Sequence, residues 1–258
     1  MSGTISFKMI SDSIGELVLS QPKRRNALNA AMWKSLPERL NDAEQEHGLK
    51  VLIIRGDGEH FAAGADISEF STLYETPETS ADISMNIANA MKALAAFPLP
   101  MLAMIRGACV GGGCALALCC DIRFADNTAQ FGVTPARLGL VYPYEDISRL
   151  IETIGISNAK DMILSTRLIK AKEAKKMGLV NFRHKVDTLE KFVMAYAQTQ
   201  TALSAQSLRT MKQMFSTYRA GQRGDNQHTH QWFLDGFSSD DFKEGYAAFM
   251  EKRKPDFK

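Results

Sequence analysis

Two short, uninterrupted apolar runs constrain the fold more than any other feature of this sequence. Residues 51–54 read Val-Leu-Ile-Ile and end at a Gly-Asp-Gly turn, and residues 101–105 read Met-Leu-Ala-Met-Ile. A run of this length without polar alternation is typical of a strand that is buried on both faces. Between them, residues 80–97 repeat apolar side chains at helical spacing until two prolines end the pattern. The sequence therefore predicts buried strands that alternate with helices.

The N-terminal segment predicts a hairpin followed by a helix. Residues 5–11 and 16–20 flank an Asp-Ser-Ile-Gly turn, which indicates two strands joined by a tight connection. Residues 29–46 repeat apolar side chains at helical spacing. Pro37 lies within that run, and a proline inside a helix removes a hydrogen bond and crowds the preceding turn. We therefore expect a kink at Pro37 or a first turn that starts late.

The second half of the chain is predicted to be largely helical. Residues 121–125 and 129–132 indicate two short strands, and almost everything after Tyr144 has helical spacing. Alternating strands and helices followed by helices alone predict an α/β core with a helical C-terminal region. A length of 258 residues suits one large core with a small appended segment. We predict a core over residues 1–200 and a helical region over residues 201–258.

Charge and hydropathy exclude several classes of protein. The net charge of +2 is nearly balanced, which argues against a nucleic-acid surface or a polybasic membrane anchor. The first residues do not show a basic segment followed by an apolar one, and no apolar run reaches the ~18–20 residues that span a bilayer. We expect a soluble, cytoplasmic protein without nucleic-acid or membrane partners.

The four cysteines crowd into one apolar stretch, as Cys109, Cys114, Cys119 and Cys120. Zinc sites use paired cysteines or histidines from separate loops, and no histidine lies near these four. We expect buried, reduced thiols that pack as small hydrophobic side chains, and no metal site.

Two glycine-containing turns are the candidate functional segments. Residues 61–67 follow a buried strand and carry small side chains, with Asp66 placed to cap a short helix. Residues 111–113 are Gly-Gly-Gly, follow another strand and open a helix. Such turns expose backbone N–H groups at the positive end of a helix, and two donors that converge from separate segments form an oxyanion hole. The alternative is that these glycines only permit tight packing. The pattern matches neither a dinucleotide-binding loop nor a Walker A loop.

The same two segments resemble the two signatures of the crotonase (enoyl-CoA hydratase/isomerase) superfamily. Phe-Ala-Ala-Gly-Ala-Asp-Ile at residues 61–67 precedes Gly-Gly-Gly-Cys-Ala-Leu-Ala-Leu-Cys-Cys-Asp-Ile at residues 111–122. The resemblance runs nearly end to end and includes residues 22–29, 125–132 and 244–257. It implies a spiral of ββα turns with a C-terminal helical region, assembled as a homotrimer or a dimer of trimers.

The resemblance also implies an activity and a set of site residues. The family holds an enolate-like thioester intermediate with two backbone N–H groups, which correspond here to Ala65 and Gly112. Coenzyme A is part of the thioester substrate, and no separate cofactor is implied. The residues placed near the coenzyme are Lys23, Arg24, Arg25, Ala63, Asp66 and Ile67, together with Phe249 and Lys252 from a C-terminal helix that often belongs to a neighbouring subunit.

Two departures from the family pattern bear on the reaction. The hydratases carry a glutamate after Gly-Gly-Gly-Cys and a second one after Phe-Gly-x-Pro, and this chain has Ala115 and Pro135 there. Hydration of a double bond needs a carboxylate to activate water and an acid to protonate the α-carbon. Neither Ala115 nor Pro135 holds a proton, so we expect ordinary hydratase activity to be absent or feeble.

The segment that follows looks like that of methylmalonyl-CoA decarboxylases, in which a threonine and, eight residues later, a tyrosine occupy the pocket. Thr134 and Tyr142 match these positions, whereas the decarboxylases carry a histidine in place of Ala65. A malonyl-type substrate brings its own carboxylate, which a pocket glutamate about 4 Å away would repel by ~4 kcal/mol at an effective dielectric of 20. Hydroxyl groups orient that carboxylate without an opposing charge.

Three functions remain open at this point. The first is a decarboxylase-like lyase, in which the Tyr142 hydroxyl acts on the substrate instead of only packing. The second is a Δ3,Δ2-enoyl-CoA isomerase with Glu145 as its base, unless Glu145 is simply a charge favoured near a helix start. The third is a non-catalytic acyl-CoA-binding subunit. The two glycine-containing turns fit all three.

Overall fold

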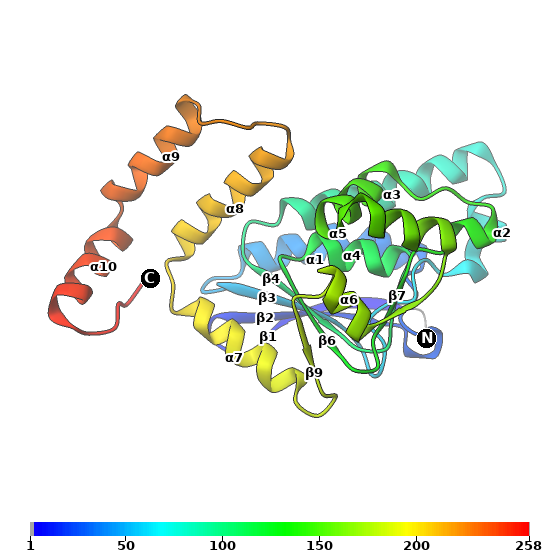
Figure 1. The fold of residues 1–258 in the computed structure, drawn as a ribbon, viewed down its shortest axis with the longest axis horizontal. Coiled ribbons are helices and arrows are strands. Elements are labelled where there is room, and N and C mark those ends of the chain that lie inside the picture. The colour runs from blue at the N-terminus through cyan, green and yellow to red at the C-terminus, as the bar shows by residue number, and fades with distance from the viewer. Residues whose placement is uncertain (1–2, 258) are drawn as a thin grey trace.

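The computed structural model describes residues 3–257 and has a mixed α/β fold built on two sheets (Figure 1). The larger sheet has six strands in the order β1-β2-β3-β4-β6-β9. Their bounds are Thr4–Met9 (β1), Ile14–Ser20 (β2), Val51–Gly56 (β3), Met101–Ile105 (β4), Ile122–Asp126 (β6) and Phe182–His184 (β9). The predicted hairpin is confirmed, since β1 pairs antiparallel with β2. All other neighbours in this sheet are parallel.

A smaller, three-stranded sheet contains the strand that directly precedes the glycine turn. It consists of β5 (Ala108–Val110), β7 (Gln130–Gly132) and β8 (Ile169–Lys170). The β5 strand is parallel to β7, and β7 is antiparallel to β8. The chain therefore leaves β5 with its backbone held by a neighbouring strand, directly before the three glycines.

The central strands β3 and β4 of the large sheet are buried on both faces, as their apolar runs predict. In β3, Leu52 and Ile54 face one core, whereas Val51 and Ile53 face the other. The first core is covered by α1 (Ala30–Gln45), α3 (Pro77–Ala96), α4 (Gly112–Cys119) and α5 (Tyr144–Ser165). The second is covered by α7 (Leu189–Thr201), which lies on the opposite side of the sheet (Figure 1).

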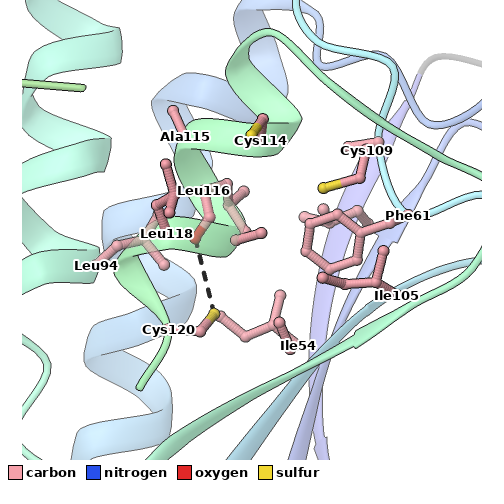
Figure 2. Close-up of a cluster of buried hydrophobic side chains, with 14 of the residues drawn as sticks. Ile54, Phe61, Leu94, Ile105, Cys109, Cys114, Ala115, Leu116, Leu118 and Cys120 are labelled. Atoms are coloured by element: carbon pink, nitrogen blue, oxygen red, sulfur yellow. Dashed lines mark hydrogen bonds between the residues drawn. The ribbon is translucent and has the colours of Figure 1, made fainter. Parts of the chain in front are cut away.

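The α4 helix is buried on almost every side and carries two of the four cysteines. Cys109, Cys114 and Cys120 lie among aliphatic and aromatic side chains of the first core, and Cys119 is half-buried (Figure 2). All four thiols are free. Burial raises the pKa of Cys119 to about 11 and that of Cys120 further. The expectation of reduced thiols that pack as small hydrophobic side chains is confirmed.

The α1 helix accommodates its internal proline. The Asn29 side chain caps the helix by accepting a hydrogen bond from the Met32 N–H at 2.9 Å, so the helix begins at Ala30. Pro37 lies inside this helix. The expectation of a late first turn is therefore wrong.

The region after Tyr144 is not purely helical, which corrects the sequence prediction. Strands β8 and β9 lie there, and β9 forms an edge of the six-stranded sheet. The β9 strand has three residues and none of them is buried, so it shows no apolar pattern to detect. The stacking of Phe182 on Phe124, with ring centroids 5.0 Å apart, helps to fix it on β6. The helices of this region are α5, α6 (Ala171–Met177), α7, α8 (Ala205–Arg219), α9 (Gln227–Ser238) and α10 (Asp240–Glu251).

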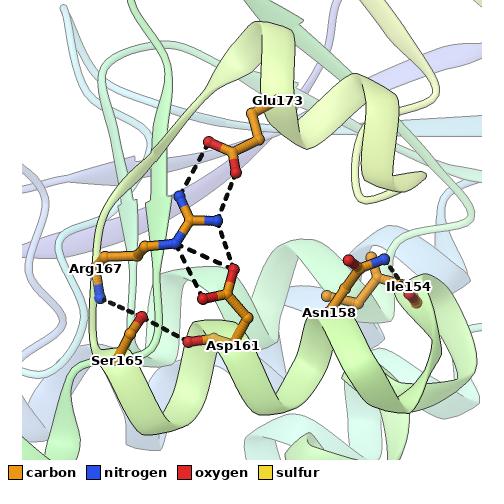
Figure 3. Close-up of polar contacts among 6 residues, drawn as sticks. All are labelled: Ile154, Asn158, Asp161, Ser165, Arg167 and Glu173. Carbon is orange, nitrogen blue, oxygen red and sulfur yellow. Dashed lines mark hydrogen bonds and ion pairs between the residues drawn. The ribbon is translucent and has the colours of Figure 1, made fainter.

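An ion network fixes the chain between α5 and α6. Arg167 lies between the two helices and contacts carboxylates from both, with its Nε 3.1 Å from Asp161 and its Nη1 3.1 Å from Glu173 (Figure 3). Hydrogen bonds from Arg167 lower the pKa of both carboxyl groups. The network is exposed, so we assign it a local role in orienting the connection.

The last three helices stand apart from the two sheets, and α10 packs mainly against α9 (Figure 1). They expose a row of aromatic side chains that includes Phe233, Phe237, Phe242, Tyr246 and Phe249. Within the described part of the chain, no helix combines the length and the apolar character that crossing a bilayer requires.

Candidate active site

The candidate site is a cavity of 760 Å³ beside the start of α4. Its walls come from the turn at residues 63–67, from α3, from the glycine turn and from the segment 134–149. Most of its lining side chains are apolar, which suits an acyl group. Both segments that the sequence singled out therefore meet at one cavity.

The Ala65 N–H is left free by the local backbone pairing. The Leu28 N–H donates to the Gly64 carbonyl at 2.7 Å, and the Asp66 N–H donates to the Leu28 carbonyl at 2.9 Å. In a parallel bridge of this kind, the backbone groups of Gly64 and Asp66 point toward Leu28. Ala65 lies between them and directs its own N–H away from Leu28. Asp66 caps the short helix Ile67–Glu69 by accepting from the Ser68 N–H at 3.1 Å, as predicted. The turn therefore presents the Ala65 N–H as a donor.

Gly112 supplies the second donor because it is the first residue of α4. The first N–H groups of a helix have no partner within it. The preceding Gly111 has φ +53° and ψ −120°, a conformation that favours glycine. A Cβ on Gly64 would lie 3.5 Å from the Gly112 nitrogen, and one on Gly112 would lie 3.9 Å from the Ala65 nitrogen. The two turns thus approach each other closely, as the two donors of an oxyanion hole must.

Tyr142 contacts this arrangement directly. Its hydroxyl donates to the Gly111 carbonyl oxygen at 3.0 Å, and its side chain is buried. The Gly111 carbonyl and the Gly112 N–H belong to the same peptide group. That carbonyl also accepts from the Ala115 N–H at 3.0 Å. Burial raises the pKa of Tyr142 well above its usual value, so the hydroxyl is protonated and acts as a donor.

The two positions at which hydratases of the family carry glutamates lie on the cavity wall. Ala115 and Pro135 both line it, next to Thr134. Among the described residues, Glu145 and Asp146 supply the only carboxylates of the lining. The Glu145 side chain is 72% exposed and lies 3.9 Å from the guanidinium groups of both Arg149 and Arg219.

A buried ion pair on α5 is a feature that the sequence analysis missed. Asp146 and Arg149 are 5% and 8% exposed, and their Oδ1 and Nη1 atoms lie 3.1 Å apart. Burial raises the pKa of Asp146, against the opposing effect of Arg149. The two residues are three apart on a helical segment, and this spacing was the sequence signal that could have revealed the pair.

Trp33 was also missed. It lines the cavity beside Gly112, and its Nε1 has no hydrogen-bond partner among residues 3–257.

The predicted coenzyme residues of the N-terminal half gather around the turn at residues 63–67. Ala63 and Ile67 line the cavity, and the Ala63 N–H donates to the Arg25 carbonyl at 3.0 Å. Arg24 lies 3.0 Å from Asp66. Asp66 is buried, which opposes ionisation, but hydrogen bonds from Ser68 and the charge of Arg24 hold its pKa below the usual value. Asp66 thus serves to hold this turn together.

Lys23 is exposed and directly precedes Arg24 in the chain, whereas the predicted coenzyme residues of the C-terminal part lie elsewhere. Phe249, 81% exposed, is on α10, and Lys252 caps the end of that helix. The α10 helix lies at the opposite end of the molecule from α2 (Phe70–Leu73), which borders the cavity (Figure 1). Within one chain, the fold does not bring Phe249 and Lys252 to Lys23.

Comparisons with known proteins identify the family of this chain. Residues 9–258 match the enoyl-CoA hydratase/isomerase family model. A probable enoyl-CoA hydratase of Mycobacterium leprae is 34% identical, over 95% of this chain and 94% of its own length. A crystal structure of an enoyl-CoA hydratase/isomerase family protein from Hyphomonas neptunium superposes with a TM-score of 0.95 and is 39% identical, covering 98% of this chain and 97% of that one. An enoyl-CoA hydratase/carnitine racemase structure from Magnetospirillum magneticum has a TM-score of 0.94 at 32% identity, over 100% and 96% of the two chains. The matched segment contains both glycine turns and the whole cavity, and the chain belongs to the enoyl-CoA hydratase/isomerase family, the crotonase superfamily.

Proposed function

We propose that this protein is a decarboxylase-like acyl-CoA lyase that acts on a malonyl-type thioester. The observation that carries the proposal is the close approach of the Ala65 and Gly112 turns, on a cavity that has Ala115 and Pro135 where hydratases carry glutamates. We infer that the two N–H groups form an oxyanion hole. Decarboxylation is the route to a thioester enolate that needs no base, because the substrate supplies the electron pair. The relatives named as hydratases share the fold, and these two positions distinguish this chain from the hydratase pattern.

The chemical step uses the hole directly. The bond between the α-carbon and the carboxylate carbon breaks, and its electron pair moves into the enolate while CO2 leaves. Negative charge then develops on the thioester oxygen, where the Ala65 and Gly112 N–H groups stabilise it. The α-carbon finally takes one proton from water or from a donor in the cavity, which gives the product thioester.

The charges around the cavity suit a substrate that carries its own carboxylate. Ala115, Pro135 and Thr134 place no charge beside the glycine turn. Of the two lining carboxylates, Asp146 pairs with Arg149 at 3.1 Å, and Glu145 is exposed and lies 3.9 Å from Arg149. The indole ring of Trp33 lies beside Gly112 and adds no charge.

In this proposal Tyr142 acts through the backbone. Its hydroxyl donates to the carbonyl of the peptide group whose N–H is the Gly112 donor. Hydrogen bonds in a chain polarise one another, so a donor on the Gly111 carbonyl strengthens the Gly112 N–H and fixes the plane of that peptide. Tyr142 is therefore a positioning residue for the oxyanion hole.

A second candidate function is the Δ3,Δ2-enoyl-CoA isomerase, and the buried carboxylate favours Asp146 over Glu145 as its base. An isomerase base must lose a proton to the cavity and return it, which suits a group whose pKa burial has raised. Glu145 is exposed and faces two guanidinium groups. The Asp146 pairing with Arg149 opposes this role, so we rank it second.

The deciding experiment is a mass-spectrometric screen of the purified protein against malonyl-, methylmalonyl-, crotonyl- and 3-enoyl-CoA. We expect a product that has lost CO2 from a malonyl-type thioester. A product with the mass of the substrate and a shifted double bond would establish the isomerase instead. Binding of these thioesters without any conversion would leave the non-catalytic acyl-CoA-binding subunit.

We predict that Tyr142→Phe lowers kcat about fivefold to tenfold, the effect of one neutral hydrogen bond, and leaves KM nearly unchanged. The ring and its packing remain, and the Gly111 carbonyl keeps its bond from Ala115, so folding is preserved. Glu145→Gln is the matched control and is expected to be nearly neutral. Steady-state kinetics on the substrate found in the screen measure both. A loss of activity in Glu145→Gln with a normal Tyr142→Phe enzyme would reverse the assignment.

We further propose that the protein assembles as a homotrimer or a dimer of trimers, in which α10 of one copy reaches the coenzyme site of the next. The exposed aromatic row on α9 and α10 has no covering element within the described chain, and contiguous apolar patches of this kind mark interfaces. Phe249 and Lys252 lie on this region, away from the cavity of their own chain.

This assembly predicts that Lys23 and Lys252 act on the same coenzyme molecule. Each exposed ion pair contributes little to the binding free energy, so Lys252→Ala is expected to weaken coenzyme A binding by only ~1 kcal/mol. The double variant with Lys23→Ala is expected to weaken it by more. Titration calorimetry measures the affinities, and analytical ultracentrifugation gives the number of copies. A double variant that binds coenzyme A normally, or a wild-type monomer with full affinity, would contradict the proposal.

A further inference from the structure

The peptide group that contains the Ala65 N–H is held from its far side by Leu28. The carbonyl of this peptide group belongs to Gly64, and it accepts a hydrogen bond from the Leu28 N–H at 2.7 Å. The Tyr142 hydroxyl holds the peptide group of the Gly112 N–H in the same way. The direction of the Ala65 N–H therefore depends on where the Leu28 backbone lies.

Asn26, two residues before Leu28, is fully buried and uses its whole amide group in hydrogen bonds. Its Nδ2 donates to the carbonyl oxygens of Asp57 at 2.9 Å and of His60 at 2.6 Å. Its Oδ1 accepts from the Gln21 N–H at 2.9 Å. The partners are two acceptors on one side and one donor on the other, so they fix the orientation of the amide.

The Gln21 side chain completes this network. Its Nε2 donates to the Ala27 carbonyl at 2.7 Å and to the Asp66 Oδ2 at 3.0 Å. Ala27 directly precedes Leu28, and Asp66 directly follows Ala65. One amide group thus joins the two segments right beside the point where they pair.

The backbone at Asn26 explains why asparagine suits this position. Its φ of +54° lies in the left-handed region, which asparagine is among the few residues to tolerate. Glycine adopts this conformation as well but has no amide. Aspartate has the same shape but would place an oxygen against the carbonyls of Asp57 and His60. Of these three residues, only asparagine meets both requirements.

We propose that Asn26 is a positioning residue for the Ala65 donor of the oxyanion hole. Its amide ties the loop at residues 57–60, which runs into the turn at residues 63–67, to the segment that ends at Leu28. Leu28 then fixes the plane of the donor peptide. A buried polar network whose members are all satisfied rigidifies one arrangement, and an oxyanion donor must be in place before the charge develops. This inference rests on the oxyanion hole of the proposed function.

Asn26→Gly is the informative variant, because glycine keeps the left-handed backbone and removes only the amide. Isotope-edited infrared difference spectroscopy measures the effect on butyryl-CoA labelled with carbon-13 at the thioester carbonyl. Hydrogen bonds to a carbonyl lower its stretching frequency. We expect the saturated wild-type protein to lower this frequency below its value in water, and saturated Asn26→Gly to lose a clear part of the lowering. Butyryl-CoA has no carboxylate to lose, so the measurement does not depend on decarboxylation.

The kinetics give a second readout. On the substrate found in the screen, Asn26→Gly is expected to lower kcat at saturation about tenfold, less than the 10²–10³ that removal of a donor costs. Val193→Ala is the control, since it opens a cavity in the second core, against α7, and lowers the melting temperature. We expect it to keep the wild-type kcat and carbonyl frequency.

The outcomes separate this proposal from the proposed function. A wild-type protein that does not lower the carbonyl frequency would remove the oxyanion hole and, with it, both proposals. A normal lowering that is fully retained in Asn26→Gly, or lost equally in Val193→Ala, would overturn the positioning role alone. If Asn26→Gly does not fold, Gln21→Met decides by the same frequency measurement, because it removes the two side-chain bonds of Gln21 from a half-buried position. An unchanged frequency in that variant would then overturn the proposal.

Discussion

Crotonyl-CoA hydration by this protein is expected to be at least ~10²-fold slower than by a hydratase that has both carboxylates. A positioned general acid or base contributes about that factor or more, and both positions are occupied by side chains that hold no proton. The structure adds that Ala115 and Pro135 line the same cavity as Gly112. If the proposed function holds, their replacement is a change at the reacting centre.

A spectrophotometric hydration assay with crotonyl-CoA measures this directly. A turnover of ~10 s⁻¹ or above, which is typical of enzymes, would contradict the prediction. The matched test is the double variant Ala115→Glu and Pro135→Glu, which restores both carboxylates on the same backbone and is expected to raise hydration above the wild-type level. The single variants are expected to gain little, because hydration needs a base for water and an acid for the α-carbon together.

The local sequence pattern predicted the elements whose burial follows a regular pattern of apolar residues along the chain. The β3 and β4 strands followed from apolar runs because both faces of each strand meet a core. The cap at Asp66 followed from a short segment whose geometry is decided within a few residues, whereas the assignment of Ala65 and Gly112 as donors came from the family resemblance. The β9 strand was missed because its three residues are exposed or half-buried, and its place in the sheet depends on pairing with β6, far away in the chain.

The candidate site likewise combines residues that the sequence placed there with contacts that only the folded chain reveals. Thr134, Tyr142 and Glu145 were placed at the cavity by resemblance, and all three line it. The partner of the Tyr142 hydroxyl, the Gly111 carbonyl, lies 31 residues away, and no local pattern predicts such a tertiary contact. The Asp146–Arg149 pair likewise has an ordinary helical spacing, and only its burial in the folded chain distinguishes it from a surface ion pair.

Replacing Gly112 by proline is expected to produce one of the largest losses of activity that a single change in this protein gives. Proline has no N–H, so the variant removes one of the two donors that stabilise the developing oxyanion. Removal of one such donor costs about 10²–10³ in kcat. Gly112 is the first residue of α4, the helix position at which proline is best tolerated, so the helix itself is expected to form.

Gly112→Ala is the control that distinguishes the loss of the N–H donor from the steric effect of an added side chain. A Cβ at this position lies 3.1 Å from the Trp33 Cζ2 atom, so alanine and proline both crowd the indole, but alanine keeps the N–H. We expect Gly112→Ala to lower kcat by roughly tenfold or less, and Gly112→Pro to fall well below it while coenzyme A affinity is unchanged in both. The kinetics of the two variants on the substrate found in the screen, with calorimetric titration of coenzyme A, measure these effects. Equal losses in the two would mean that the contact with Trp33, and not the N–H, limits the reaction. In that case Gly112 would have to be removed from the oxyanion hole, and the enolate mechanism would lose its second donor.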